Sequence, residues 1–158
     1  MQDLSWRGRL EGIFITEAQS LPMQEIAEAK LIEGVGIEGD RYATGKGKYS
    51  VKPGEDRQVT LIEMETIEAI RRDHRIALEP VETRRNLVTR GVPLNHLVGR
   101  SFSVGEVVLF GCRLNAPCKY LEGLLGKPVY TPLLNRSGLN CRIVRGGVVR
   151  AADAVRPA

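Results

Sequence analysis

Apolar and polar residues alternate in several short segments of the chain, and a period of two is typical of β-strands. The clearest alternation lies in residues 8–16 (GRLEGIFIT) and 57–63 (RQVTLIE). Shorter β-rich runs ended by turn residues lie at 84–91 (RRNLVTRG), 106–114 (EVVLFGCRL) and 140–149 (NCRIVRGGVV). In the last run the Gly-Gly pair predicts a turn followed by a returning strand. Each of these segments is therefore expected to be extended.

Two segments have helical spacing instead. Residues 63–74 (EMETIEAIRRDH) gather their apolar side chains on one stripe and leave a charged face, which predicts an amphipathic helix. Residues 118–126 (CKYLEGLLG) predict a shorter helix that stops at Gly126. Many short strands without regular strand-helix alternation favour a mostly β fold, a closed or partly closed antiparallel barrel with a few helices. At 158 residues we expect a single domain spanning 1–158.

The stretch GVGIEGDRY, residues 34–42, matches the dinucleotide-binding pattern G-x-G-x-x-G. In that fold a helix follows the glycines and its N-terminal amides bind the pyrophosphate. Residues 43–58 (ATGKGKYSVKPGEDRQ) contain glycines and a proline without helical spacing, so we predict a loop here and no helix. The pattern therefore does not indicate a dinucleotide site.

The composition and charge of the chain limit the classes of function that it can have. The chain is 42% hydrophobic and 27% charged, no run approaches the ~20 apolar residues of a membrane span, and the first residues lack a secretory apolar core, so a cytoplasmic protein without membrane contact is expected. The net charge of +4 suits an anionic partner or serves solubility alone. With 5% aromatic residues and no reading module, nucleic-acid binding is not expected. A small phosphorylated or oxyanionic ligand fits better.

Two polar segments are candidates for binding that ligand. Asp40 and Arg41 end the glycine stretch, and the alternative is a turn held by its own hydrogen bonds. Arg84, Arg85 and Asn86 enter a predicted strand, where alternation places Arg84 and Asn86 on one face and Arg85 on the other. An arginine fork and an amide on one face suit a phosphate or carboxylate. The alternative is an exposed strand end with solvated arginines.

The segment around Cys118 is the strongest candidate for chemistry. Pro117 precedes Cys118, which lies at or near the first turn of the predicted helix, where the helix dipole and the neighbouring Lys119 favour a thiolate. Such a cysteine can be a nucleophile, a sulfur carrier or a soft-metal ligand. A buried structural cysteine is the alternative, and Cys112 and Cys141 fit that role better. The three cysteines form no C-x-x-C pair, which argues against a disulfide framework.

The segments together resemble a stand-alone MOSC domain, the module named for the C-terminal domain of molybdenum cofactor sulfurases. The resemblance runs in order through GVGIEGDRY (34–42), RQVTLIE (57–63), RRNLVTRGVPLNHLVGRSFSVGEVVLFG (84–111), APCKYLEG (116–123) and RSGLNCRIVRGGVVRAAD (136–153). It implies a β-barrel, a cleft for molybdopterin, and Cys118 as molybdenum ligand or sulfur carrier. It also implies cofactor-binding roles for Arg84, Asn86, Asp40 and Arg41, with Lys119 beside the thiol. The glycine stretch would then be a wall of the cleft, where small residues let the backbone approach a ligand.

Two positions depart from the family pattern. Tyr42 stands where the family usually has histidine after Gly-Asp-Arg, so any role of that imidazole is absent. Ala152 stands where the family commonly has glycine, so the turn has lost its easy access to positive φ.

The resemblance leaves three functions open. In the first, a molybdenum enzyme reduces small N-hydroxylated substrates at a Cys118-bound metal, with electrons from a donor protein. In the second, Cys118 carries a persulfide, loaded by a cysteine desulfurase, without turnover of its own. In the third, Cys118 is structural and the arginines bind a phosphorylated ligand or an acidic partner. A homodimer that covers edge strands is compatible with each.

Overall fold

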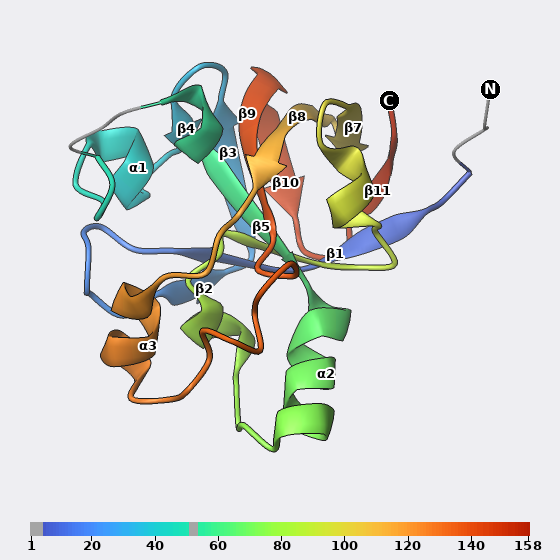
Figure 1. Ribbon diagram of the computed structural model, residues 1–158. Coiled ribbons are helices and arrows are strands. Elements are labelled where there is room, and N and C mark those ends of the chain that lie inside the picture. Colours follow the sequence, from blue (N-terminus) through green and yellow to red (C-terminus); the bar gives the residue numbers. More distant parts are fainter. Residues whose placement is uncertain (1–4, 51–53) are drawn as a thin grey trace.

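Seven strands close into a barrel in the computed structural model, which describes residues 5–50 and 54–158 (Figure 1). In sheet order the strands are β11 (Ala154–Pro157), β7 (Ser101–Val104), β8 (Val107–Leu114), β9 (Leu139–Arg145), β5 (Val59–Glu63), β6 (Leu87–Arg90) and β1 (Gly8–Ile15). Pairing of β1 with β11 closes the barrel, and β5–β6 is its parallel pair. The predicted mostly β barrel is confirmed, as are the strands predicted at residues 8–16 and 57–63.

The barrel interior is filled by apolar side chains that alternate inward along the strands. Leu10, Leu61, Leu87, Phe102 and Leu139 are each at most 1% exposed. Burying each such side chain contributes about 1.5–3 kcal/mol, so these side chains stabilise the barrel strongly. The barrel is therefore a packed core, and any binding site must lie at its ends or outside it.

A second, smaller sheet lies against the barrel and corrects one prediction. It contains β10 (Gly147–Arg150), β3 (Glu28–Ile32) and β4 (Gly36–Ile37), while β2 (Gln24–Ile26) pairs with β1 at the barrel. The strand after the Gly-Gly pair was expected to return along the strand before it, but β10 pairs with β3 instead. The reason is that both edges of β9 already pair with β5 and β8.

Two helices pack on one side of the barrel (Figure 1). They are α2 (Met64–His74) and α3 (Lys119–Leu125), which confirms both helices predicted from spacing, and Gly126 ends α3 in the left-handed conformation at φ 64°. Ile67 and Ile70 of α2 join Leu121 of α3 and outward-facing side chains of β5 and β6 in a second apolar cluster. Strands β5 and β6 are consequently buried on both faces. Among the described residues no helix is long and apolar enough to cross a membrane.

A one-turn helix, α1 (Arg41–Thr44), follows the glycine stretch, and the prediction that no helix follows is therefore wrong. The Asp40 carboxylate caps it by accepting from the backbone N–H of Tyr42 at 3.3 Å, and Gly45 ends it at φ 77°. The physical reason is local, since an aspartate cap and a left-handed glycine suffice for one turn without an apolar stripe. Short 3-10 helices lie at Glu55–Arg57, Pro80–Thr83 and Leu94–Leu97.

Replacing Ala152 with glycine is expected to raise the free energy of unfolding by up to about 1 kcal/mol. Ala152 has φ 76°, so the turn keeps the left-handed geometry that glycine adopts without steric cost. The measurement is urea denaturation of both proteins. Its control, Ala151→Gly, lies one residue earlier and is exposed, and it should lower stability through chain entropy alone. Equal destabilisation by both substitutions would contradict the inference that the backbone is strained at Ala152.

Candidate functional site

A cleft of about 240 Å³ opens where α1, α3 and the ends of β8 and β9 meet. We call it the main cleft, and its lining residues are Arg41, Tyr42, Tyr49, Arg57, Thr60, Arg84, Arg85, Arg113, Asn115, Ala116, Pro117, Cys118 and Asn140. Five of these are arginines, and within residues 5–50 and 54–158 no Asp or Glu belongs to the lining. A site with this composition attracts anions and repels cations.

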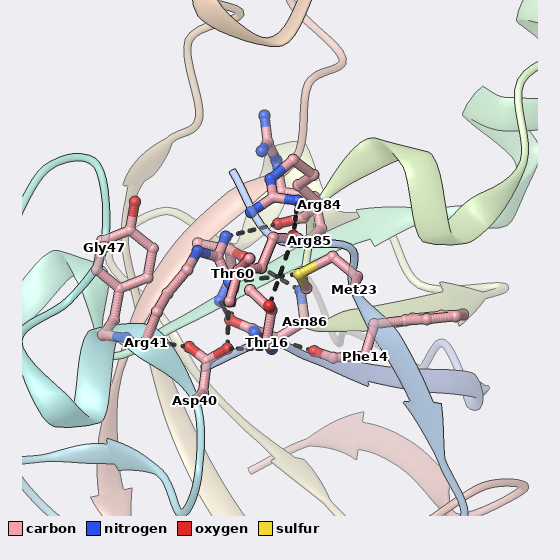
Figure 2. Close-up of polar contacts among 12 residues, drawn as sticks. Phe14, Thr16, Met23, Asp40, Arg41, Gly47, Thr60, Arg84, Arg85 and Asn86 are labelled. Atoms are coloured by element: carbon pink, nitrogen blue, oxygen red, sulfur yellow. Dashed lines mark hydrogen bonds and ion pairs between the residues drawn. The ribbon is translucent and has the colours of Figure 1, made fainter. Parts of the chain in front are cut away.

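Arg41 lines the main cleft and is held in place by Asp40 (Figure 2). Arg41 Nη1 donates to Asp40 Oδ1 at 3.1 Å, and Arg41 Nη2 donates to the carbonyl oxygen of Arg84 at 3.1 Å. Asp40 is fully buried, also accepts from the backbone N–H of Thr16, and does not line the cleft itself. Asp40 therefore orients Arg41 and α1 from behind, while Arg41 reaches the cleft.

Arg84 is a buried cation that pairs with no carboxylate in the part of the chain that the structure describes. Its Nη1 donates to the carbonyl oxygen of Leu21 at 2.7 Å, while its Nη2 is buried without a hydrogen-bond partner among the described residues. Burial, followed by the charge of Arg41, lowers the pKa of Arg84 below its usual value. An unpaired buried guanidinium is unfavourable by itself, and an anion in the cleft would relieve that cost.

Arg85 is held in the same wall by neutral acceptors. Its Nε donates to the carbonyl oxygen of Ser137 at 3.0 Å, its Nη1 to the carbonyl oxygen of Thr83 at 3.2 Å, and its Nη2 to Ser137 Oγ at 2.9 Å and to Asn115 Oδ1. Burial of the guanidinium lowers the pKa of Arg85 to about 10, with Arg41 adding to the effect. Arg85 remains charged at neutral pH, so it contributes a second fixed positive charge to the cleft.

The prediction that Arg84 and Asn86 lie on one face of a strand, with Arg85 on the other face, is wrong. Arg84 has φ 60°, in the left-handed region, and β6 begins only at Leu87, so strand alternation does not extend back to residue 84. Arg84 and Arg85 both line the cleft, whereas Asn86 is buried outside its lining. Asn86 Oδ1 accepts from Thr60 N at 3.1 Å, and its Nδ2 donates to the Phe14 carbonyl at 3.1 Å. Asn86 thus ties β5 and β1 together beneath the arginines.

Cys118 lies at the N-cap of α3, half-buried, with its thiol in the lining of the main cleft. Tyr49 lies beside it, and hydrogen bonding to Cys118, followed by burial, raises the pKa of Tyr49 to about 12. Lys119 does not line the cleft. Its ammonium pairs with Glu122 Oε2 at 3.3 Å and lies 4.4 Å from the centre of the Tyr130 ring. The structure therefore brings Cys118 together with Arg41, Arg84 and Arg85, but not with Lys119.

Comparison with known proteins agrees with the fold. Residues 48–156 match the sequence model of the MOSC domain family. The chain belongs to the MOSC domain family. Among solved structures it resembles the YuaD protein from Bacillus subtilis (TM-score 0.80, 19% identity, 95% of this chain and 96% of that one) and YiiM from Geobacillus stearothermophilus (TM-score 0.74, 12% identity, 96% and 75%). YiiM from Escherichia coli follows (TM-score 0.67, 20% identity, 95% and 69%). No curated protein matches the chain.

MOSC domains are a family associated with binding of the molybdenum cofactor. In this MOSC domain the glycines of residues 34–39 do not line the main cleft, which corrects the expectation that they form its wall. A β carbon on Gly36 would lie 3.1 Å from the carbonyl oxygen of Gln58 and 3.3 Å from the Ala43 side chain. Within the glycine stretch Gly36 therefore packs tightly against its neighbours, and Arg41 and Tyr42 after the stretch reach the cleft.

Sequence reasoning missed six polar lining residues of this MOSC domain, namely Tyr49, Arg57, Thr60, Arg113, Asn115 and Asn140. Arg113 lies opposite Asn140 only because the β8–β9 pairing shifts register between Gly111 and Arg113. A bulge of this kind re-aims side chains, and alternation counted along a strand cannot reveal it. Tyr49 lies on a loop without any periodic pattern.

Proposed function

We propose that this chain binds the molybdenum cofactor in the main cleft, with Cys118 as the metal ligand, and reduces N-hydroxylated substrates there. One observation carries the proposal. Buried Arg84 and half-buried Arg85, which pair with no carboxylate in the described residues, share one cleft with a half-buried thiol. Phosphate suits the arginine forks, and molybdenum suits a soft thiolate.

The side chains present fit this group. Arg84 Nη2 is an orphaned buried donor, which an oxyanion would satisfy. Arg57 and Arg113, the second of which also pairs with Asp56, add guanidinium groups to the lining, and Asn115 and Asn140 add amides that are joined by a 2.7 Å hydrogen bond. These residues would hold the phosphate and the pterin, while Cys118 would hold the metal.

The cofactor would supply the two-electron redox chemistry that the side chains of the cleft lack. Reduction of an N-hydroxylated substrate breaks its N–O bond, consumes two electrons and two protons, and releases water. A partner protein would supply the electrons. Tyr49, whose pKa is raised to about 12, keeps its proton at neutral pH and can donate a hydrogen bond beside Cys118.

Molybdenum content tests the proposal directly. Wild-type protein from a molybdate-fed, cofactor-competent bacterium is expected to contain near-stoichiometric molybdenum by elemental analysis, and Cys118→Ala to lose at least about tenfold, because the soft ligand is gone. Cys112→Ala is the matched control, since Cys112 is also half-buried but does not line the cleft. Equal metal in Cys118→Ala and wild type, or none in either, would overturn the proposal.

Sulfur transfer is a second candidate, favoured by the accessibility of the same thiol. Cys118 is half-buried in an open cleft and is not in a disulfide, so a partner's sulfur donor could reach it. Intact mass after incubation with a cysteine desulfurase would then show one added sulfur atom on wild type, removable by reductant, and none on Cys118→Ala. Failure of wild type to load would reject this candidate.

A further inference from the structure

The main cleft continues into a smaller pocket on the other side of Cys118. This second pocket has a volume of about 40 Å³ and adds Gln19, Lys48, Tyr120 and Leu121 to residues that it shares with the main cleft. We call it the tyrosine pocket, because Tyr42, Tyr49 and Tyr120 all line it. Cys118 lines both spaces and therefore lies at their junction.

Each tyrosine of this pocket is paired with a cation. The pairs are Arg41 with Tyr42 (4.7 Å to the ring centre), Arg57 with Tyr49 (5.2 Å) and Lys48 with Tyr120 (5.3 Å). The Tyr120 hydroxyl also lies 2.7 Å from Ser20 Oγ. Such contacts fix the rings in place, which makes the pocket a preformed, planar-walled space.

The charge around the tyrosine pocket is one-sided. Arg84, Arg85 and Lys48 line it, and no carboxylate does so in the described part of the chain. Asp40 lies behind the wall and neutralises only Arg41, at 3.1 Å. A cation that enters the pocket would meet fixed positive charges at short range, where Coulomb energies reach a few kcal/mol.

The size of the pocket limits what can enter. A water-sized group needs about 10–15 Å³ of such volume, so about three non-hydrogen atoms fit at once. The remainder of a larger molecule would have to lie in the open mouth, beside exposed Lys48 and Gln19. The pocket can therefore recognise a head group but not a whole molecule.

We propose that the tyrosine pocket is the substrate pocket. It takes a planar, neutral or anionic head group of about three non-hydrogen atoms, excludes cations, and tolerates varied groups beyond the head. The part of the main cleft outside this pocket takes the phosphate, between Arg113 and the unpartnered Arg84 Nη2. This inference rests on the proposed function in taking Cys118 as the point of reaction, and it adds the substrate's charge and location.

Three probes of one shape and different charge test the selectivity: benzoate, benzamide and benzamidine. The full chain is expressed without molybdate, and binding is followed by NMR shifts of the Tyr120 and Leu121 amides. Benzamide and benzoate are expected to bind, and benzamidine to bind at least about tenfold more weakly than benzamide, because of the positive wall. Equal or tighter binding of benzamidine would overturn the inference.

Two variants and a competition experiment test whether the head group and the phosphate bind in separate parts of the cleft. Benzamide and inorganic phosphate are expected to bind wild type together, without competition. Tyr120→Ala should weaken benzamide about tenfold and leave phosphate unchanged, and Arg113→Met should do the reverse. Competition between benzamide and phosphate for wild type would overturn the inference. Loss of both benzamide and phosphate binding in one variant, with the second variant binding both as wild type does, would also overturn it. Because no probe contains metal, this result is independent of the molybdenum content of Cys118→Ala, and the two proposals can fail separately.

Discussion

Replacing Gly138 with alanine is expected to lower the free energy of unfolding by about 4 kcal/mol or more. Gly138 has φ 111°, is buried, and lies directly before β9, where a β carbon would overlap the carbonyl oxygen of Leu61 on β5. The β carbon is fixed to the backbone next to Leu139 and the oxygen belongs to the backbone of β5, so neither can move without disturbing the pairing of Leu61 with Leu139. The backbone strain and the overlap therefore add.

Gly138 also positions the site, since its carbonyl oxygen accepts from the backbone N–H of Asn115 at 2.7 Å. The variant is thus expected to lose phosphate binding together with stability. Urea denaturation and a phosphate titration measure the two effects. Gly123→Ala is the matched control, because Gly123 lies in α3 with open space around its β carbon, and alanine there should stabilise the protein by about 0.5–1 kcal/mol. A Gly138→Ala protein as stable as wild type would contradict the geometry.

Replacing Arg84 with methionine is expected to weaken phosphate binding about tenfold or more and yet raise the free energy of unfolding by about 1 kcal/mol. The first effect follows from losing an unpartnered donor in the cleft. The second follows because the side chain is a buried cation near Arg41 without a carboxylate of its own, and methionine fills similar space without charge. Phosphate titration by calorimetry and urea denaturation measure the two quantities.

Arg100→Met provides the control for this prediction. Arg100 is an exposed arginine outside the main cleft, so its replacement should change neither quantity by more than about 0.5 kcal/mol. If Arg84→Met binds phosphate more weakly but has a higher free energy of unfolding, the charge of Arg84 serves ligand binding and not stability. A variant that loses both would show instead that Arg84 serves mainly as a structural link to Leu21.

The sequence predicted those parts of the fold that depend on local order. Alternation in residues 8–16 and 57–63 predicted strands, and spacing in residues 63–74 predicted a helix. These predictions are correct because the burial of one face of a strand or helix produces a periodic pattern among neighbouring residues. The sequence did not predict which strand pairs with β10. The partner of β10 depended on which edges β9 had already used, and that is a property of the assembled sheet.

The candidate site divides in the same way. Cys118 at a helix start, and Arg41 and Arg84 as candidates for anion binding, were recognisable by residue type and short-range context, whereas Arg85 was expected on the opposite face. The facing of Arg84 was not, since a left-handed residue between a 3-10 helix and β6 interrupts the alternation. Asn86 was assigned to the cleft by its place in the motif, but its hydrogen bonds direct it to Thr60 and Phe14.

By itself the sequence determined the fold class, the family and the types of side chain available for chemistry, because these follow from patterning, order of segments and residue identity. Only the tertiary structure decided which side chains meet. Arg113 and Asn140 reach the main cleft through the pairing of β8 with β9 and its register shift, and Tyr49 reaches it from a loop. Such contacts join residues far apart in the chain, and their geometry is set by the closure of the barrel rather than by any local preference.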